Sequence, residues 1–306
     1  MEKKPNILVT SPFYLPFLPE LEKLFTVNKY WETNTAGNET EAIITSSKYP
    51  FPDELYELPN LKIISCYGVG FDSINLGITN KKKIIVTNTP EVLSEAVADH
   101  ALGLLLGLTK QITEGDRFVR QGRWPNEELP LGMDLKGKTC GIAGMGRIGK
   151  EIALRAKVFG MKISYYGRTQ KKDLSYTYHS ELNELAHNSD VLVIAMPSNK
   201  DTQKIIDSKI LKSLGSKGIL INISRGSLID EKALIEALKD GTILSAGLDV
   251  FEKEPHIPEE MLKLENVVLT PHIGSATNET RAAMGDLVIE NLKNYFAKGT
   301  ALTPVE

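Results

Sequence analysis

Residues 139–169 read TCGIAGMGRIGKEIALRAKVFGMKISYYGRT, and this stretch decides the fold class. An apolar run at 139–143 leads into a glycine-rich turn, a helix-forming stretch at 147–158 and a second apolar run at 162–166. A strand, a tight turn, a helix and another strand in this order form a βαβ unit, whose two strands are parallel. We therefore expect a doubly wound α/β domain in the middle of the chain.

The same alternation extends in both directions from this stretch. Toward the C-terminus the sequence predicts strands at 191–195, 219–223, 245–248 and 267–269, and helices at 205–214 and 231–239. Toward the N-terminus it predicts strands at 7–10, 42–45, 62–66 and 84–87, and helix-like segments at 18–24 and 53–58. Short apolar strands that alternate with helices are typical of parallel sheets covered on both faces. The predicted fold is α/β, with a Rossmann domain inserted into a smaller flavodoxin-like domain.

The expected domain boundaries follow from this order of elements. Residues 1–98 form the first unit, and residues 99–278 form the Rossmann domain. A last helix at 279–296 returns to the first unit, which therefore also contains residues 279–306. Between the two patterns, residues 91–120 predict one long helix that is apolar on more than one face. Such a helix is buried inside the monomer or against a second subunit.

Composition restricts the class of protein. The 306 residues carry a formal net charge of −3, with 42% hydrophobic and 25% charged residues, which gives no basic surface for nucleic acid or an anionic membrane. Two cysteines, Cys66 and Cys140, are too few for a disulfide framework or a zinc cluster. The densest apolar stretch, 101–108, is too short to span a bilayer. We expect a soluble, cytoplasmic protein with a small-molecule ligand, no metal and no membrane or nucleic-acid partner.

The glycine-rich turn at 144–149 has the spacing of a dinucleotide site. Gly144 permits the tight turn, Gly146 allows a pyrophosphate to approach the backbone, and Gly149 allows close packing of helix on strand. The pyrophosphate then lies at a helix N-terminus, where free amides and the helix dipole favour an anion. A tight strand–helix connection without a ligand is the alternative.

The end of the strand at 162–166 predicts which dinucleotide binds. NAD-binding domains usually have an acidic residue here for the ribose hydroxyls, but this chain has Gly167 followed by Arg168. A glycine makes room for the 2′-phosphate of NADP, and a guanidinium can bind it with two hydrogen bonds. We therefore expect NADP(H), although Arg168 with Lys171 and Lys172 could instead form only a solvated basic turn.

Three further segments that follow predicted strands carry one cation, one carboxylate and one imidazole: Arg225, Glu254 and His272. Ligands bind at the carboxyl ends of strands in open α/β sheets, so we expect these side chains at one edge. Reduction of a 2-oxoacid needs a cation for the substrate oxygens and a proton donor for the keto oxygen. Arg225 suits the first role and His272 the second, and Glu254 can orient the imidazole and favour its protonated form.

On these segments the chain resembles the D-isomer-specific 2-hydroxyacid dehydrogenases, over nearly its whole length. The matching pieces are 67–72, 86–90, 144–149, 222–226, 247–255 and 271–277. Within the family the chain is most similar to NADPH-preferring hydroxyphenylpyruvate and glyoxylate/hydroxypyruvate reductases. The family's catalytic arginine, glutamate and histidine fall on Arg225, Glu254 and His272. Residues 195–198 depart from the family pattern around Pro197, which leaves the packing beside the cofactor open.

The resemblance implies further site residues. It places the substrate carboxylate on the backbone amides of Val69 and Gly70, the nicotinamide amide on Asp249, and Ser275 beside the substrate. It also implies a homodimer, in which the helix at 102–108 packs against the second subunit and Trp124 belongs to an arm. With the motif residues, the expected cofactor contacts are Gly144, Met145, Gly146, Arg147, Ile148, Gly149, Gly167, Arg168, Thr169, Pro197, Ile223, Ser224, Arg225, Asp249, His272 and Gly274.

The expected function is therefore NADPH-dependent reduction of a 2-oxoacid to the D-2-hydroxyacid, with glyoxylate, hydroxypyruvate or hydroxyphenylpyruvate as the type of substrate. The first unit is expected to bind substrate and the Rossmann domain to bind NADP. Two alternatives remain. One is an NAD(P)-sensing interaction protein, because corepressors of this fold retain the catalytic residues. The other is a formate-type dehydrogenase, against which the Glu254 and His272 pair argues.

Overall fold

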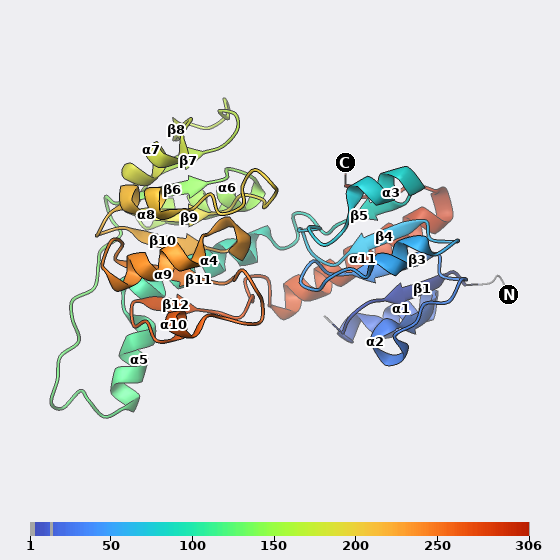
Figure 1. Ribbon diagram of the computed structural model, residues 1–306, viewed down its shortest axis with the longest axis horizontal. Coiled ribbons are helices and arrows are strands. Elements are labelled where there is room, and N and C mark those ends of the chain that lie inside the picture. The colour runs from blue at the N-terminus through green and yellow to red at the C-terminus, as the bar shows by residue number, and fades with distance from the viewer. Residues whose placement is uncertain (1–3, 13–14, 306) are drawn as a thin grey trace. The chain divides into compact units, whose positions relative to one another are not determined.

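The computed structural model describes residues 4–12 and 15–305 and divides into two compact units (Figure 1). The first unit comprises residues 1–93 and 275–306, and the second comprises residues 94–274. These bounds lie a few residues before the expected 98/99 and 278/279. The reason at the first boundary is that a helix begins at Ser94 and packs within the second unit.

The first unit contains a five-stranded parallel sheet with the order β2-β1-β3-β4-β5. Its strands are β1 (Asn6–Val9), β2 (Thr26–Lys29), β3 (Ala42–Thr45), β4 (Ile63–Cys66) and β5 (Ile85–Thr87). Its helices are α1 (Leu18–Leu24), α2 (Tyr30–Thr33), α3 (Leu76–Lys82) and α11 (Asn278–Lys298). The order is that of flavodoxin-like sheets. The fold expected for this unit is confirmed.

The C-terminal segment extends the ordered structure of the first unit beyond α11. Pro304 forms an antiparallel bridge with Thr87, and the Val305 amide donates to the Val86 carbonyl at 2.8 Å. Pro304 and Val305 therefore lie along β5, the strand that precedes residues 88–90.

The second unit contains a seven-stranded parallel sheet with the order β12-β11-β10-β9-β6-β7-β8. Its strands are β6 (Thr139–Ala143), β7 (Lys162–Tyr166), β8 (Thr177–His179), β9 (Val191–Ile194), β10 (Ile219–Asn222), β11 (Ser245–Leu248) and β12 (Val267–Leu269). Counted from β6, this is the Rossmann order 3-2-1-4-5-6 with one strand added at the edge. The predicted doubly wound sheet is confirmed.

Helices cover both faces of this sheet. They are α4 (Ser94–Thr109), α5 (Ile112–Arg120), α6 (Arg147–Val158), α7 (Leu182–His187), α8 (Ser208–Leu214), α9 (Glu231–Lys239) and α10 (Glu259–Leu262). Helices α7, α8 and α9 share a hydrophobic cluster with alternate strand residues such as Leu192 and Leu220. Helix α4 packs against α6 and against β10, β11 and β12. A methyl group on Gly247 would lie 3.0 Å from Cβ of Leu104, so this glycine permits the close approach of α4.

The prediction of one long helix at 91–120 is wrong, because two helices occupy this region. The chain turns at Gln111, which has a left-handed φ of 53°, and α5 then leaves the sheet. The apolar residues of α4, including Leu102, Leu104 and Leu105, are buried within the second unit itself. Leu106 and Leu108 are half-buried and Gly103 is exposed, so the expected packing of 102–108 against a second subunit stays a prediction.

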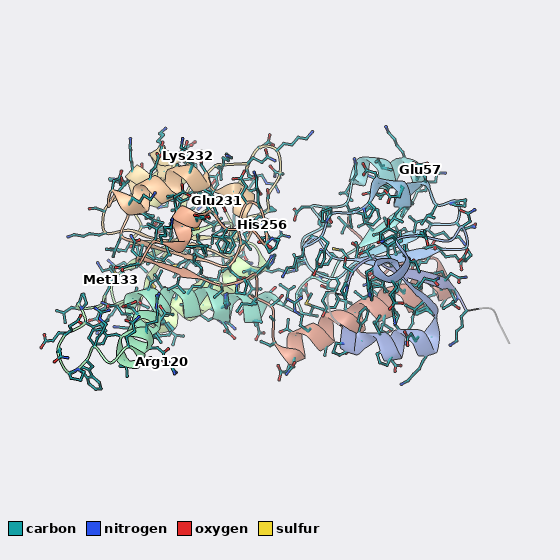
Figure 2. The ribbon with its side chains drawn as sticks, turned by 60° about the horizontal axis from the view of Figure 1, so that its bottom comes forward. Glu57, Arg120, Met133, Glu231, Lys232 and His256 are labelled. Carbon is teal, nitrogen blue, oxygen red and sulfur yellow. The ribbon has the colours of Figure 1, made fainter. Side chains whose placement is uncertain are left out.

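Some of the exposed apolar side chains, those of Ile112, Val119, Trp124 and Leu131, lie on an arm formed by residues 112–134. Figures 1 and 2 show α5 and the extended stretch after it projecting from the seven-stranded sheet, with Arg120 and Met133 on this arm. The arm returns where the Met133 amide donates to the Thr109 carbonyl at 2.7 Å. Trp124 is 70% exposed and Leu131 is 98% exposed.

Sequence patterns missed the edge strands β2 and β8 and the short helices α2, α3, α7 and α10. Strand β2 has alternating exposed and half-buried residues, and β8 has no buried residue, so neither has the continuous apolar run of the central strands. Residues Asp53–Glu57 form a 3-10 helix. Among the described residues, none of the helices combines the length and apolar character needed to cross a membrane.

Candidate active site

The glycine-rich turn after β6 has three glycines with three different surroundings. Gly144 has a φ of +104°, and a methyl group on it would lie 2.7 Å from the backbone of Ala195. A methyl group on Gly149 would lie 2.1 Å from the Gly144 carbonyl oxygen, whereas one on Gly146 would meet nothing within 4 Å. The first and last glycines are therefore required by the fold, and the middle one leaves open space at the N-terminus of α6. This arrangement fits a dinucleotide pyrophosphate.

The turn after β7 carries the predicted selectivity residues. Gly167 does not have a positive φ, and a methyl group on it would have only the Thr169 carbonyl oxygen as a neighbour, at 3.9 Å. The backbone therefore does not require glycine here. The Tyr178 hydroxyl donates to the Gly167 carbonyl at 3.1 Å, and the Lys171 amide donates to the Tyr165 hydroxyl at 2.8 Å. Arg168 thus lies, exposed, on a turn whose backbone is fixed from both sides.

Arg225 follows β10 on a loop that hydrogen bonds hold on both sides. The Asn222 side chain donates to the Arg225 carbonyl at 2.9 Å and accepts from the Ser224 amide at 3.1 Å. The Ser224 hydroxyl donates to the Met196 carbonyl at 2.5 Å, which ties the loop to the end of β9. Met196 is buried in the core, whereas the neighbouring Pro197 is exposed.

The loop after β10 also contacts the loop after β11 directly. A methyl group on Gly226 would lie 1.9 Å from the backbone carbon of Phe251. The Phe251 amide in turn donates to Oε1 of Glu254 at 3.1 Å. Close backbone packing therefore keeps the Arg225 loop and the Glu254 loop adjacent, and only glycine permits it.

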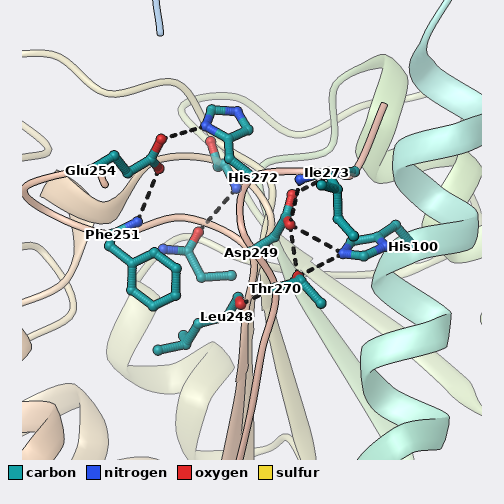
Figure 3. Close-up of polar contacts among 11 residues, drawn as sticks. His100, Leu248, Asp249, Phe251, Glu254, Thr270, His272 and Ile273 are labelled. Atoms are coloured by element: carbon teal, nitrogen blue, oxygen red, sulfur yellow. Dashed lines mark hydrogen bonds and ion pairs between the residues drawn. The ribbon is translucent and has the colours of Figure 1, made fainter. Parts of the chain in front are cut away.

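Glu254 and His272 form the predicted pair. Nδ1 of His272 lies 2.7 Å from Oε2 of Glu254 (Figure 3). The two side chains are 29% and 18% exposed, so the contact is partly shielded from water but open on one side. A separation of 2.7 Å is typical of a charge-assisted hydrogen bond. The arrangement orients the ring and leaves Nε2 as the nitrogen that can exchange a proton.

The backbone of His272 is in the left-handed region, with a φ of 54°. Few non-glycine residues adopt this conformation, and surrounding contacts must stabilise it. The His272 amide donates to the Asp249 carbonyl at 2.9 Å and to the Thr270 carbonyl at 3.0 Å. These contacts set the direction in which the imidazole leaves the chain.

Asp249 is the centre of the network beneath His272. Its carboxylate accepts from the Ile273 amide on Oδ1 and from the Gly274 amide on Oδ2, both at 2.8 Å (Figure 3). Burial by itself raises the pKa of this carboxyl. The hydrogen bond from His100, followed by those from the Ile273 amide and Thr270, outweighs burial and holds the pKa below its ordinary value. Asp249 is therefore a buried anion that fixes the segment containing His272.

The sequence analysis missed His100 and Thr270 in this network. The Thr270 hydroxyl donates to Oδ1 of Asp249 at 2.7 Å. Because that hydroxyl has a single hydrogen, Nε2 of His100 must donate in its 2.9 Å contact with Thr270. One signal was available, since His100 is a polar residue within the apolar stretch that became α4. The pattern did not indicate its partners, which lie about 150 to 170 residues away.

The remaining predicted residues take different positions. Val69 and Gly70 lie in the first unit, on the turn after β4, and Ser275 is the first residue of that unit's second segment. Met145 and Ile223 are buried, Gly274 is buried beside Asp249, and Thr169 and Pro197 are exposed. The structure thus brings Glu254 and His272 into direct contact, and it joins Arg225 to them through adjoining loops.

Comparison with known proteins gives consistent results. Residues 102–274 match the family model described as "D-isomer specific 2-hydroxyacid dehydrogenase, NAD binding domain". The chain is 46% identical over 308 residues to glyoxylate/hydroxypyruvate reductase A of Arabidopsis thaliana, with 98% of each chain covered. It is 43% identical over 309 residues to hydroxyphenylpyruvate reductase of Plectranthus scutellarioides, again with 98% of each covered.

Solved structures show the same relationship. The chain is similar to the crystal structure of NADPH-dependent glyoxylate/hydroxypyruvate reductase from Sinorhizobium meliloti in complex with NADP and malonate. The TM-score is 0.94 at 42% sequence identity, and the match covers 99% of this chain and 97% of that one.

Proposed function

The chain belongs to the D-isomer-specific 2-hydroxyacid dehydrogenases, and we propose that it is an NADPH-dependent reductase of a 2-oxoacid that forms the D-2-hydroxyacid. The observation that carries this proposal is the 2.7 Å contact between His272 and Glu254. Related proteins named for glyoxylate, hydroxypyruvate and hydroxyphenylpyruvate reduction support this substrate class.

His272 is the proposed proton donor. When a hydride is added to the keto carbon, the keto oxygen gains negative charge and must be protonated. Since Nδ1 of His272 faces the Glu254 carboxylate, the proton that is transferred is the one on Nε2. The carboxylate stabilises the protonated imidazole before the transfer and keeps the ring in one orientation afterward.

Arg225 is the proposed cation for the substrate. Its guanidinium can hold two oxygens at once and therefore orients both the carboxylate and the keto oxygen. The resemblance adds the amides of Val69 and Gly70 as donors to the carboxylate, and Ser275 as a residue beside the substrate. Arg225 and the two amides each bind a functional group that all 2-oxoacids share, so they do not select the substrate's side chain.

NADP(H) is the proposed cofactor, and when bound it supplies the hydride. The residues fit it in three places. The open side of Gly146 leaves space at the N-terminus of α6 for the pyrophosphate. Gly167 and Arg168 accommodate the 2′-phosphate, because the backbone does not itself demand a glycine there. The carboxylate of Asp249 retains acceptor capacity on Oδ2, which takes one backbone hydrogen bond, and this atom can hold the nicotinamide amide.

A homodimer is the proposed assembly, with the arm at 112–134 as the contact. A second copy of the chain would cover its exposed apolar residues, including Trp124 and Leu131. The expected contact through the helix at 102–108 remains part of this proposal. A cytoplasmic location also remains a proposal, supported by the low cysteine content.

Turnover measurements test the proposal. The purified chain is assayed with glyoxylate, hydroxypyruvate and 4-hydroxyphenylpyruvate at fixed NADPH and, separately, at fixed NADH. We expect turnover with at least one oxoacid and a higher kcat/KM with NADPH. An equal kcat/KM with NADH contradicts the proposal that Arg168 binds the 2′-phosphate of NADP(H). Absence of turnover with all three oxoacids, in a folded protein that binds NADPH, favours an interaction protein instead.

A further inference from the structure

The turn that carries Val69 and Gly70 is held by its carbonyl groups. The Gly68 carbonyl accepts from the Thr89 amide at 2.9 Å. The Val69 carbonyl accepts from Nδ2 of Asn88 at 2.8 Å, and the Gly70 carbonyl accepts from the Cys66 thiol at 3.1 Å. The carbonyl oxygens of three successive residues therefore each accept a hydrogen bond, which fixes their direction.

Fixed carbonyls determine where the amides point. In a planar trans peptide, the carbonyl of one residue and the N–H of the next point in opposite directions. The bond to the Gly68 carbonyl therefore aims the Val69 N–H away from Thr89. In the same way, the bond from Asn88 aims the Gly70 N–H away from the Asn88 side chain. Gly68 has a φ of +148°, a conformation that other residues rarely adopt, so the turn begins with a residue suited to it.

The C-terminal segment in turn holds Asn88. The Thr303 hydroxyl donates to the Asn88 carbonyl at 2.6 Å, and the Asn88 amide donates to the Thr303 carbonyl at 3.3 Å. Thr303 is anchored by Asn291, a fully buried residue of α11. Nδ2 of Asn291 donates to the Thr303 hydroxyl at 2.9 Å, and its Oδ1 accepts from the Thr303 amide at 3.0 Å. A continuous chain of hydrogen bonds thus runs from α11 to the turn, entirely within the first unit.

We propose that Asn88, braced by Thr303, is a positioning residue that aims the Gly70 amide at the carboxylate of the 2-oxoacid. The inference rests on the proposed function, since it takes the substrate to be a 2-oxoacid held by the Val69 and Gly70 amides. Asn88 itself does not touch the substrate in this arrangement. Its loss weakens binding of the carboxylate, while hydride and proton transfer depend on the second unit.

Four variants of the full-length chain test this assignment. Asn88→Ala removes the donor to the Val69 carbonyl. Thr303→Val removes the hydroxyl that braces Asn88 but keeps the side-chain shape, whereas Thr303→Ser keeps the hydroxyl. Asn60→Ala is the matched control, because Asn60 makes the same kind of bond at 2.7 Å to the Asn38 carbonyl on an exposed loop of the same unit.

The expected result is a separation of the kinetic constants. Asn88→Ala and Thr303→Val raise the KM for glyoxylate by about threefold to tenfold, the effect of losing one neutral hydrogen bond. The KM for NADPH and kcat stay within about twofold of wild type, because the lost interaction acts on binding of the oxoacid alone. Thr303→Ser and Asn60→Ala behave as wild type. If Asn88→Ala does not fold, the comparison of Thr303→Val with Thr303→Ser decides the matter.

Three outcomes overturn the inference. One is an unchanged KM for glyoxylate in folded Asn88→Ala or, if that variant does not fold, in Thr303→Val. Another is a fall in kcat together with a rise in the KM for glyoxylate and in the KM for NADPH. The third is an equal effect of Thr303→Val and Thr303→Ser. The wild-type chain is assayed first, and its failure to reduce any 2-oxoacid refutes the proposed function rather than the role of Asn88.

Discussion

Replacing Glu254 by Gln tests the proposed acid–base pair most directly. The substitution keeps the shape of the side chain and an acceptor for the Phe251 amide, but it removes the negative charge 2.7 Å from Nδ1 of His272. Reduction needs a proton donor at Nε2, and the Glu254 carboxylate holds the ring in the orientation that presents this nitrogen. Without its charge the contact with Nδ1 is weaker, and the reductive kcat should fall.

The contact geometry gives the size of this fall in kcat. A hydrogen bond that involves a charged group contributes about 1.5–3 kcal/mol, and about 1.4 kcal/mol corresponds to a tenfold change in rate. The two side chains are 29% and 18% exposed, so solvent screens the pair only partly. Since Gln still accepts a neutral hydrogen bond, the lower part of this range applies. We expect the reductive kcat to fall about tenfold.

The assay is the reductive kcat with saturating NADPH and glyoxylate, measured for wild type, Glu254→Gln and Glu252→Gln. Glu252 is the matched control, because its side chain lies 3.8 Å from Lys204 and removing its charge leaves the His272 contact in place. The KM for NADPH should stay near the wild-type value in both variants, since the lost contact acts on proton transfer. An unchanged kcat in Glu254→Gln, or an equal fall in Glu252→Gln, refutes the reasoning.

Four other outcomes follow from the structure. His272→Ala should lower the reductive kcat by about a hundredfold to ten-thousandfold with a smaller effect on NADPH binding, and near-wild-type turnover at every pH would exclude it as the acid. Gly167→Asp with Arg168→Ala should fold normally and raise the KM for NADPH more than it changes kcat, which kinetics with both cofactors will show. Asp249→Asn should lower the melting temperature at pH 7. Because the folded pKa of Asp249 is depressed, its stabilisation is complete above the unfolded value of about 3.9 and is lost as pH falls through the folded value, so the difference in melting temperature should shrink below about pH 4. Sedimentation at micromolar concentration should show a dimer that Leu131→Glu converts to a monomer, and a wild-type monomer contradicts the assigned role of the arm.

Local sequence was sufficient where a residue's role depends on its immediate neighbours. The strand, turn and helix at 139–158 agree with the structure at both strand and helix bounds, because glycine spacing and apolar runs fix them over a few residues. The central strands were predictable for the same reason, since burial on both faces makes them apolar throughout. The edge strands β2 and β8 lack such burial and left no comparable pattern. The end of α4 was also missed. The backbone of Gln111 is left-handed, and glutamine is not a residue type that predicts a turn.

The sequence by itself determined the fold class. It also predicted the dinucleotide turn and the candidate catalytic residues Arg225, Glu254 and His272, because each of the three follows a strand whose carboxyl end must meet the others at one edge. Only the tertiary structure decided how Glu254 and His272 meet. It also decided that His100 holds Asp249 and that Thr303 braces Asn88. Asn88 and Thr303 are 215 residues apart, and their contact exists only because the C-terminal segment lies along β5. Hydrogen bonds between such distant residues leave no periodic pattern in the chain, since folding of the whole unit brings them together.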